Sequence, residues 1–421
     1  MKLLVVGSGG REHALVTKLL ENPKVEQIFV APGNGGMATN CTSVNIKATD
    51  VEGMVNFAKE NNIDFAVIAP EDPLVIGMVD EMEKAGIPAF GPNKNAAILE
   101  GSKVFSKDLM KKYSIPTAKY ETFDNENKAI EYIKAENTYP TVIKADGLAL
   151  GKGVIIAQNE KEGIDAVHSI MGDKIFGSSG NHIVIEEFLE GPEVSVLAFT
   201  DSKTIVPMVS AKDHKRALDN DMGLNTGGMG TIAPNPYYTD EVARECMEKI
   251  FVPTVNAMNS EGRPFKGCLF FGLMITKNGT KVIEYNCRFG DPETQVVLPL
   301  LKSDLLEIFE AVRNETLSDV KVEFSKESAA CVVMASGGYP QKYQTGYEIE
   351  GLDENGQADG VTVFHAGTKL ENGKFLTAGG RVLGVTAIGK DREDALKKSY
   401  DAVAKINFKD AHFRKDIGKI K

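Results

Sequence analysis

The sequence predicts a multidomain protein of mixed α/β and α+β class, and three observations support this. The chain has 421 residues, which at roughly 150 residues per domain corresponds to about three domains. Apolar residues make up 42% and charged residues 25%, as in an ordinary globular protein rather than a disordered or collagen-like chain. Short apolar runs alternate with helical patterns over the first hundred residues, which is typical of a doubly wound parallel sheet.

The N-terminal domain is predicted over residues 1–100, with a Rossmann-like fold. Runs at residues 3–6, 28–31 and 63–69 are apolar enough to be parallel strands buried on both faces. A capping box and an amphipathic pattern predict a helix between the second and third runs. Another helical pattern, over residues 74–85, follows the third run and ends at a glycine with a proline just beyond.

A second domain is predicted over residues 101–325, where the pattern changes. It begins with a helix over 103–113 and includes a mobile flap subdomain at about 120–190. A long helix is expected at about 239–260 and a polar, glycine-rich loop at 212–235. Strands are expected at 140–144, 154–157, 182–187, 193–200, 204–211, 268–276 and 280–287.

A small mixed α/β domain is predicted over residues 326–421. Apolar runs at 329–335 and 381–388 are expected to be strands, and residues 391–405 form an amphipathic helical pattern.

Charge and composition exclude several classes of protein. The chain has 48 basic and 59 acidic residues, a net charge of −11, whereas a general nucleic-acid binder needs a basic surface. No apolar run approaches the ~18 residues of a membrane span. The apolar run at the start of the sequence is too short for the core of a signal peptide. The five cysteines are far apart and the six histidines do not cluster. We therefore expect a cytoplasmic protein with reduced thiols, no zinc site, and no membrane or nucleic-acid partner.

The first glycine-rich loop, Gly7-Ser8-Gly9-Gly10-Arg11-Glu12, lies where a strand is expected to turn into a helix. Glycines there let backbone N–H groups approach a phosphate at a helix N-terminus. A dinucleotide fingerprint requires glycine at the position of Glu12, and no acidic residue closes the second strand. A phosphate-bearing small substrate is therefore favoured over a nicotinamide cofactor, with a purely structural turn as the alternative. A second loop, which includes Asn34, follows the second strand at the same sheet edge.

The second glycine-rich loop, residues 144–153, joins two apolar strands. A Walker loop needs four residues between its glycines and Ser or Thr after its lysine. Here three residues separate Gly147 from Gly151, and Gly153 follows Lys152. We interpret the loop as a flap that folds over the phosphates of a nucleotide, and a glycine-rich surface hairpin is the alternative.

The stretch at 282–293 is the most informative in the chain. In a strand, alternate side chains share a face, so Glu284, Asn286 and Arg288 point one way and the residues between them point into a core. Two oxygen ligands beside a guanidinium suit Mg²⁺, which takes one or two protein oxygens and completes its octahedron with phosphates and water. The alternative is a solvated strand with a Glu–Arg pair.

Taken together, these features resemble the ATP-grasp family of carboxylate–amine ligases, over residues 1–421. Within that family the chain is similar to the branch that ligates glycine to phosphoribosylamine in purine biosynthesis. One departure is Ala69-Pro70-Glu71-Asp72-Pro73, where the family usually has Gly-Pro-Glu-Ala-Pro, but Glu71 is retained. The motifs that carry the resemblance lie at 7–14, 31–34, 143–148, 151–154, 185–189, 213–216, 225–230, 284–295, 364–368 and 414–418.

The resemblance implies an ATP-grasp core and a two-step, ADP-forming ligation. ATP phosphorylates the glycine carboxylate, and the amine of 5-phosphoribosylamine attacks the resulting glycyl phosphate to give glycinamide ribonucleotide. Such chemistry requires positioning and charge neutralisation more than a nucleophilic side chain. The implied cofactors are ATP and Mg²⁺, or Mn²⁺, and a monomer is expected. The alternatives are another ATP-grasp enzyme, such as a carboxylase acting on a purine intermediate, and a nucleotide-binding protein without ligase activity.

The resemblance also implies roles for individual residues. Glu284 and Asn286 are the metal ligands, and Arg288, Asp213 and Lys215 are the catalytic candidates. The nucleotide is expected to contact Lys103, Lys144, Gly147, Gly151, Lys152, Gly153, Glu186, Glu187, Phe188, Leu189 and Glu193. The substrates are expected to contact Gly9, Gly10, Arg11, Glu12, Asn34, Glu71, Arg216, Gly228 and Asp291. For His13, beside the first loop, a site role and a core role are equally favoured.

Overall fold

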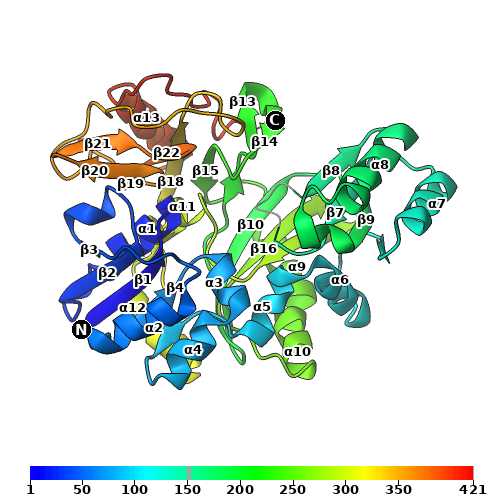
Figure 1. Ribbon diagram of the computed structural model, residues 1–421, viewed down its shortest axis with the longest axis horizontal. Coiled ribbons are helices and arrows are strands. Elements are labelled where there is room, and N and C mark those ends of the chain that lie inside the picture. Colours follow the sequence, from blue (N-terminus) through cyan, green and yellow to red (C-terminus); the bar gives the residue numbers. More distant parts are fainter. Residues whose placement is uncertain (149–152, 421) are drawn as a thin grey trace.

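A computed structural model describes residues 1–148 and 153–420. It confirms the predicted class: a parallel sheet at the N-terminus is followed by two antiparallel sheets and a C-terminal antiparallel sheet with a covering helix (Figure 1).

The N-terminal sheet has five parallel strands in the order β3-β2-β1-β4-β5. This order starts at the centre and winds outward on both sides, as the alternating sequence pattern predicts. The strands are β1 (Lys2–Gly7), β2 (Gln27–Pro32), β3 (Thr42–Ser43), β4 (Phe65–Ile68) and β5 (Ala89–Phe90). The helices are α1 (Gly10–Leu19), α2 (Val51–Glu60), α3 (Glu71–Ile76) and α4 (Met78–Lys84).

The helix predicted over 74–85 is two helices. Gly77 separates α3 from α4 with φ of +97°, in the left-handed region that a continuous helix cannot contain. The earlier start places Glu71 in the first turn of α3, at the carboxyl edge of the parallel sheet, where β4 ends.

Two four-stranded antiparallel sheets follow. The first, in the order β6-β9-β7-β8, belongs to the arm at the right of Figure 1, and the second has the order β11-β10-β16-β17. Their strands are β6 (Tyr120–Phe123), β7 (Thr141–Ala145), β8 (Val154–Ala157), β9 (Ile183–Glu187), β10 (Glu193–Asp201), β11 (Ile205–Pro207), β16 (Lys266–Thr276) and β17 (Gly279–Asn286). The helices are α5 (Lys94–Gly101), α6 (Lys103–Lys112), α7 (Glu126–Glu136), α8 (Glu160–Val167), α9 (Asp240–Cys246) and α10 (Val252–Ser260).

The prediction of a loop over 212–235 is wrong, because this segment forms four short strands. β13 (Arg216–Leu218) and β14 (Met222–Asn225) make a hairpin. β12 (Lys212–Asp213) and β15 (Gly230–Ala233) instead join the C-terminal sheet, in which β15 pairs with β18 (Ser328–Ala335). The polar sequence does not reveal β12 and β15, because the sheet that they join is completed by β18, which lies about a hundred residues after β15.

The C-terminal sheet has the order β12-β15-β18-β22-β19, with α13 (Arg392–Val403) packed against β18 and β22. The predicted strands at 329–335 and 381–388 and the closing helix are confirmed. Three further strands were not predicted. The remaining elements are β19 (Thr362–His365), β20 (Thr368–Glu371), β21 (Lys374–Thr377), β22 (Arg381–Gly389), α11 (Thr294–Val297) and α12 (Leu305–Asn314).

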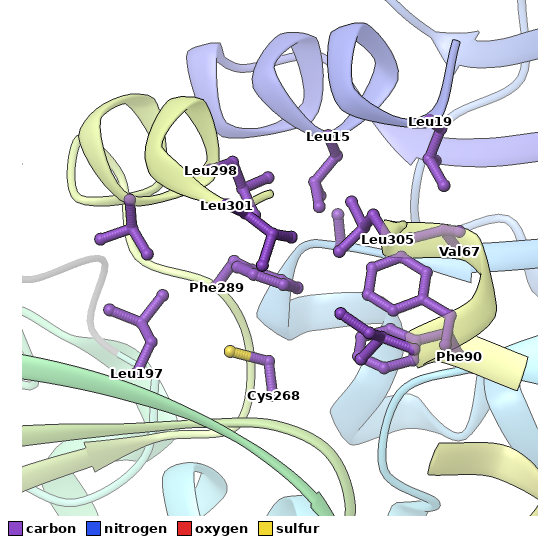
Figure 2. Packing of buried hydrophobic residues seen from close by; sticks show 14 of the residues in the cluster. Leu15, Leu19, Val67, Phe90, Leu197, Cys268, Phe289, Leu298, Leu301 and Leu305 are labelled. Carbon is purple, nitrogen blue, oxygen red and sulfur yellow. The ribbon is translucent and has the colours of Figure 1, made fainter. Parts of the chain in front are cut away.

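One hydrophobic core joins the N-terminal sheet to the later parts of the chain. Leu15 and Leu19 of α1 face Leu298, Leu301 and Leu305 across this core (Figure 2). Below them lie Val67 and Phe90 of the parallel sheet, Leu197 of β10, Cys268 of β16, and Phe289, which follows β17. The end of β17 is therefore held by a core shared between the first and second parts of the chain.

The cysteines are free thiols, and all except Cys41 are buried, as predicted. In the described part of the chain, no helix is both long enough and apolar enough to cross a membrane.

Candidate active site

The alternation predicted after residue 282 is confirmed. Tyr285 and Cys287 are buried, and the Tyr285 hydroxyl lies 2.9 Å from Thr254 Oγ1. Glu284 and Asn286 occupy the opposite face of β17 and are partly exposed. β17 is an edge strand whose only partner among the named strands is β16. On its outer edge Val282 forms an isolated bridge with Thr117, and beyond that bridge the edge is open to groups from other elements.

Three half-exposed side chains, Glu193, Lys215 and Glu284, form what we call the open cluster. Lys215 Nζ lies 3.1 Å from Glu193 Oε2 and 3.8 Å from Glu284 Oε1. The charge of Glu193 raises the pKa of Lys215 although its partial burial opposes this. Burial opposes ionisation of Glu284, but the positive charges of Lys215, Lys144 and Lys103 outweigh it and lower the Glu284 pKa. Predicted metal, nucleotide and catalytic residues thus come together here.

Lysines from two elements surround this cluster. Lys144, in β7, lies 3.1 Å from Glu186 Oε2 and donates to Ile283 O at 3.1 Å. Lys103, at the start of α6, donates to Gly147 O at 2.7 Å. Burial lowers the Lys103 pKa. Both predicted phosphate ligands therefore lie beside β17, and Lys103 already contacts the base of the predicted flap.

The segment predicted to bind adenine begins in the last residues of β9 and continues beyond the end of that strand. The Glu186 carboxylate lies between Lys144 and Lys107, and Lys107 Nζ is 3.2 Å from Glu186 Oε1. Burial lowers the pKa of Lys107 to about 8. Glu187 pairs instead with Lys281 at 2.8 Å. Phe188 and Leu189 follow outside regular secondary structure, and the Phe188 side chain is exposed.

A second ionic group, which we call the buried network, consists of Arg11, Glu71, Glu100, Asn286 and Arg288. Arg288 Nε donates to Glu71 Oε2 at 3.1 Å, and its NH2 group lies 3.1 Å from Glu100 Oε1. Arg11 NH1 lies 3.6 Å from the same Glu71 oxygen. Burial opposes ionisation of Glu71, but Arg288 and Arg11 lower its pKa to about 2. The predicted catalytic arginine is thus held between two carboxylates.

The first glycine-rich loop closes on its own side chains. Glu12 Oε2 accepts from Gly9 N–H at 2.6 Å, and Glu12 Oε1 lies 2.5 Å from Arg11 Nε. Gly10 has a packing role, because a Cβ there would lie 2.5 Å from Gln295 Nε2 of α11. Substrate contacts of Gly9, Gly10, Arg11 and Glu12 stay predictions.

Asp213 lies against two tight turns. Its Oδ1 accepts from His214 N–H at 2.7 Å, and a Cβ on Gly228 would lie 2.6 Å from the same oxygen. Gly228 has φ of +120°, so a side chain there would be both strained and obstructed. Burial, followed by the charge of Glu293, raises the Asp213 pKa well above its usual value.

Arg381, in β22, binds both the turn that contains Gly227 and the turn that contains Asp291. Its NH1 group donates to Gly227 O and Asp291 O, each at 2.9 Å. Its NH2 group lies 3.3 Å from the Asp291 carboxylate. The C-terminal sheet therefore positions the turns around Asp213, which itself lies in β12 at the edge of that sheet.

Some predicted residues lie apart or make other contacts. Arg216 NH1 donates to Gly223 O within the β13–β14 hairpin at 2.9 Å. Asn34 Nδ2 donates to Ser8 O at 2.9 Å and to His365 O at 2.7 Å, so it braces the loop at the sheet edge. Gly151 and Lys152 lie outside the described residues, and Gly153 is the residue at which the described chain resumes.

His13 has a core role. Its Nδ1 accepts from His365 N–H at 2.8 Å, and burial lowers the His13 pKa to about 3. It is therefore a neutral contact between α1 and β19 rather than a proton carrier.

Sequence reasoning missed Glu100, Lys107, Glu293 and Arg381. Glu293 is buried and accepts from Ser195 Oγ at 2.9 Å, and its charge acts on Asp213 although the two are far apart in sequence. The available signal was weak: Glu100 interrupts the apolar run of α5, and Glu293 lies in the same motif as Asp291. Each acts through a partner distant in sequence, which a local pattern does not identify.

The donor set of β17 suits a cation that shares its coordination with phosphates. Within the described residues, no group of three or more His, Cys, Asp or Glu could hold a metal by itself. Glu284 and Asn286 offer two oxygen-bearing side chains on one strand face, with lysines nearby for the charge of phosphates. This fits Mg²⁺, which binds through few protein ligands together with substrate oxygens.

Comparison with known proteins places the whole chain. Family models for phosphoribosylglycinamide synthetase match as the N domain over residues 1–100, the ATP-grasp (A) domain over 101–294 and the C domain over 329–420. The phosphoribosylamine–glycine ligase of Clostridium acetobutylicum is 51% identical, with 100% of both chains covered. That of Fusobacterium nucleatum is 48% identical, with 99% of this chain and 98% of the relative covered.

Solved structures agree. The crystal structure of the Thermotoga maritima phosphoribosylamine–glycine ligase has a TM-score of 0.85 and 33% identity, and the match covers 99% of this chain and 100% of that one. Campylobacter jejuni biotin carboxylase has a TM-score of 0.75 at 13% identity, covering 98% and 92%, which shows a shared fold alone. The chain belongs to the phosphoribosylglycinamide synthetase family.

Proposed function

We propose that the protein uses ATP to ligate glycine to 5-phosphoribosylamine, through glycyl phosphate, in de novo purine biosynthesis. The products are glycinamide ribonucleotide, ADP and phosphate. The observation that carries the proposal is the 51% identity over the entire chain to a phosphoribosylamine–glycine ligase. The open cluster supports it, because it brings Glu193, Lys215 and Glu284 within contact distance at the edge of β17.

The nucleotide is proposed to lie between β7, β9 and β17. Lys103 and Lys144 hold the phosphates, because both act electrostatically on Glu284 and lie on the side of β17 that the predicted flap would cover. Glu193 accepts the ribose hydroxyls. The segment from Glu186 to Leu189 receives adenine, and the loop from Gly147 through Gly151 and Lys152 to Gly153 covers the phosphates.

Glu284 and Asn286 are proposed to hold Mg²⁺, or Mn²⁺ in its place. The cation, when bound, neutralises phosphate charge and aligns the transferring phosphoryl group. Lys215 faces the same region and is kept charged by Glu193 and Glu284, so it stabilises negative charge that develops during transfer.

Glycine and its acyl phosphate are proposed to bind at Asp213 and the Gly227–Gly230 turn. Asp213 is partly exposed, and although burial and then the charge of Glu293 raise its pKa, Lys215 opposes this shift and a bound ammonium group would oppose it further. A carboxylate there recognises the ammonium group of glycine, while Lys215 takes the carboxylate end. Arg216 and Gly228 complete this side.

The amine substrate is proposed to bind at the carboxyl edge of the parallel sheet, near Gly9, Gly10, Arg11, Glu12, Asn34, Glu71 and Asp291. Arg288 lies between this edge and β17, because it pairs with Glu71 on one side and follows Asn286 on the other. This position supports a role for Arg288 where the acyl phosphate and the attacking amine are proposed to meet. We also propose domains at 1–100, 101–325 and 326–421, a monomer, and a cytoplasmic location that suits the free thiols.

Release of ADP and phosphate tests the function. The assay uses purified protein, ATP and Mg²⁺, with glycine and freshly generated phosphoribosylamine added separately and together. We expect turnover only when both substrates are present, with one ADP and one phosphate per glycinamide ribonucleotide. Release stimulated by bicarbonate would instead indicate a carboxylase, and nucleotide binding without turnover would indicate a binding protein.

A further inference from the structure

Glu100 makes contacts that suggest more than a structural ion pair. It lies in the last turn of α5, which packs against β17, and its side chain is buried. Its Oε1 accepts from Asn286 Nδ2 at 3.0 Å and lies 3.1 Å from Arg288 NH2. Its Oε2 accepts from Cys287 N–H at 2.6 Å. One carboxylate therefore holds three consecutive residues at the point where β17 ends.

We propose that Glu100 is a positioning residue that turns the Asn286 amide oxygen toward the catalytic cation. This inference rests on the proposed function only in that Glu284 and Asn286 are taken as the cation ligands. An asparagine amide has a donor end and an acceptor end, and either can face a given neighbour. Because both Glu100 oxygens accept from surrounding donors, the NH2 end of Asn286 must face Glu100. The amide oxygen is then left for the strand face that Glu284 shares.

The same contact relates the cation side of the site to the substrate side. Glu100 Oε1 is shared between Asn286 and Arg288, and Arg288 continues to Glu71 at 3.1 Å. The orientation of the metal ligand and the position of the arginine are thus fixed by one buried oxygen. Residues that orient metal ligands in this way change metal affinity by about 10–100-fold when they are replaced.

Substitution of Glu100 by Gln makes a specific geometric prediction. The glutamine keeps the size of the side chain but replaces one acceptor oxygen with a donor NH2 group. Because the Cys287 backbone N–H can only donate, the glutamine oxygen is expected to keep that contact and the NH2 group to face Asn286. Asn286 can satisfy this NH2 group only by rotating its amide, and the rotation presents NH2 rather than oxygen to the cation. Asn286→Asp in the same background removes the difficulty, because one carboxylate oxygen accepts from the NH2 group of the introduced glutamine while the other remains available to the cation.

The experiment measures the affinity for a non-hydrolysable ATP analogue with and without Mn²⁺, by calorimetry, so that no turnover is needed. In wild type, Mn²⁺ should increase the affinity. Glu100→Gln should reduce this Mn²⁺-dependent gain by about 10–100-fold and leave the metal-free affinity unchanged. The double variant Glu100→Gln with Asn286→Asp should recover most of the gain. Asn286→Asp alone should not show the full Mn²⁺-dependent gain, because its carboxylate faces the carboxylate of Glu100.

A matched control is Asp201→Asn. Asp201 is also buried and accepts backbone N–H groups, from Lys203, Thr204 and Leu317, but it lies at the opposite end of β10 from Glu193. It should lower the melting temperature and leave the Mn²⁺-dependent gain intact. The proposal is overturned if Glu100→Gln keeps the full gain, if it loses metal-free affinity equally, or if the double variant is no better than the single one. Failure of the ligase itself would appear separately, as absent glycine-dependent turnover in wild type.

Discussion

The open cluster and the buried network use the same kinds of side chain in opposite ways. In the open cluster, Glu193, Lys215 and Glu284 are 38–50% exposed. Each can therefore exchange its ion-pair partner for a ligand with little disturbance of the fold. In the buried network, Arg288, Glu71 and Glu100 are 5–23% exposed, and each charge has a protein partner. The first arrangement suits groups that exchange partners during a reaction. The second suits groups that must not move.

The difference follows from desolvation. Removing an ion from water costs several kcal/mol, and a buried pair recovers this only while both partners remain. A half-exposed pair retains much of its hydration, so its loss costs little. The comparison therefore predicts that substitutions in the two groups separate stability from activity.

The largest effect on stability is expected for Arg288→Met. It leaves Glu71 and Glu100 buried without their shared cation, and should lower the free energy of unfolding by about 3–5 kcal/mol. Urea unfolding followed by circular dichroism measures this. The triple variant Arg288→Met with Glu71→Gln and Glu100→Gln should recover part of the loss. A change below about 1 kcal/mol, typical of exposed pairs, would mean that the network is not effectively buried.

Glu284→Gln should have the next largest effect, on turnover. Loss of a cation ligand should exceed the effect of its supporting residues and lower kcat by at least about 100-fold. The free energy of unfolding should barely change, because Glu284 faces away from the core. Near-wild-type turnover at ordinary Mg²⁺ would contradict the assignment of Glu284 as a ligand.

Buried histidines extend the comparison to groups that have no counter-charge. Burial lowers the pKa of His365 to about 4 and that of His13 to about 3. As pH falls below about 6.5, the unfolded chain takes up protons that the folded chain does not, so stability falls. His365→Gln should reduce the loss between pH 6.5 and 5.5 by about 1 kcal/mol. Urea unfolding at the two pH values tests this, and equal losses in variant and wild type would contradict it.

A small effect on stability is also expected for Lys215→Met. Because the side chain is half-exposed, the free energy of unfolding should change by less than about 1 kcal/mol. The KM for glycine should nevertheless rise, since Lys215 is proposed to contact its carboxylate end. Thermal unfolding and glycine titrations on one preparation measure both. A large loss of stability with an unchanged KM would contradict this prediction. It would mean that Lys215 stabilises the fold, as proposed for the buried network, and does not bind glycine.

Local patterns in the sequence are sufficient for most of the fold and for one face of the site. The apolar runs of the first hundred residues predict the parallel sheet, and the period of two after residue 282 predicts the shared face of Glu284 and Asn286. Both are properties of neighbouring residues. The split between α3 and α4 is not predicted although Gly77 is visible, because a single glycine is tolerated in many helices.

Contacts between distant residues account for what the sequence does not reveal. β12 and β15 pair in a sheet completed by β18, and no alternation of apolar residues marks them. Glu100 reaches Asn286 across 186 positions of the chain. Gly10 resembles a phosphate-binding glycine, but the space that its side chain would need is filled by Gln295. In each case the partner that decides the role is set by tertiary packing.

The shared core has a consequence for how the chain is made. One face of the N-terminal sheet is covered by α2 and α4, which are synthesised with it. The other face packs on residues that emerge much later: Phe90 stacks on Phe309 with ring centroids 3.7 Å apart. At translation rates of about 5–20 residues per second, the interval between those two phenylalanines is roughly 10–40 s. During that time α1 covers only part of this face, and the rest remains apolar surface without its final partners, of the kind that chaperones shield.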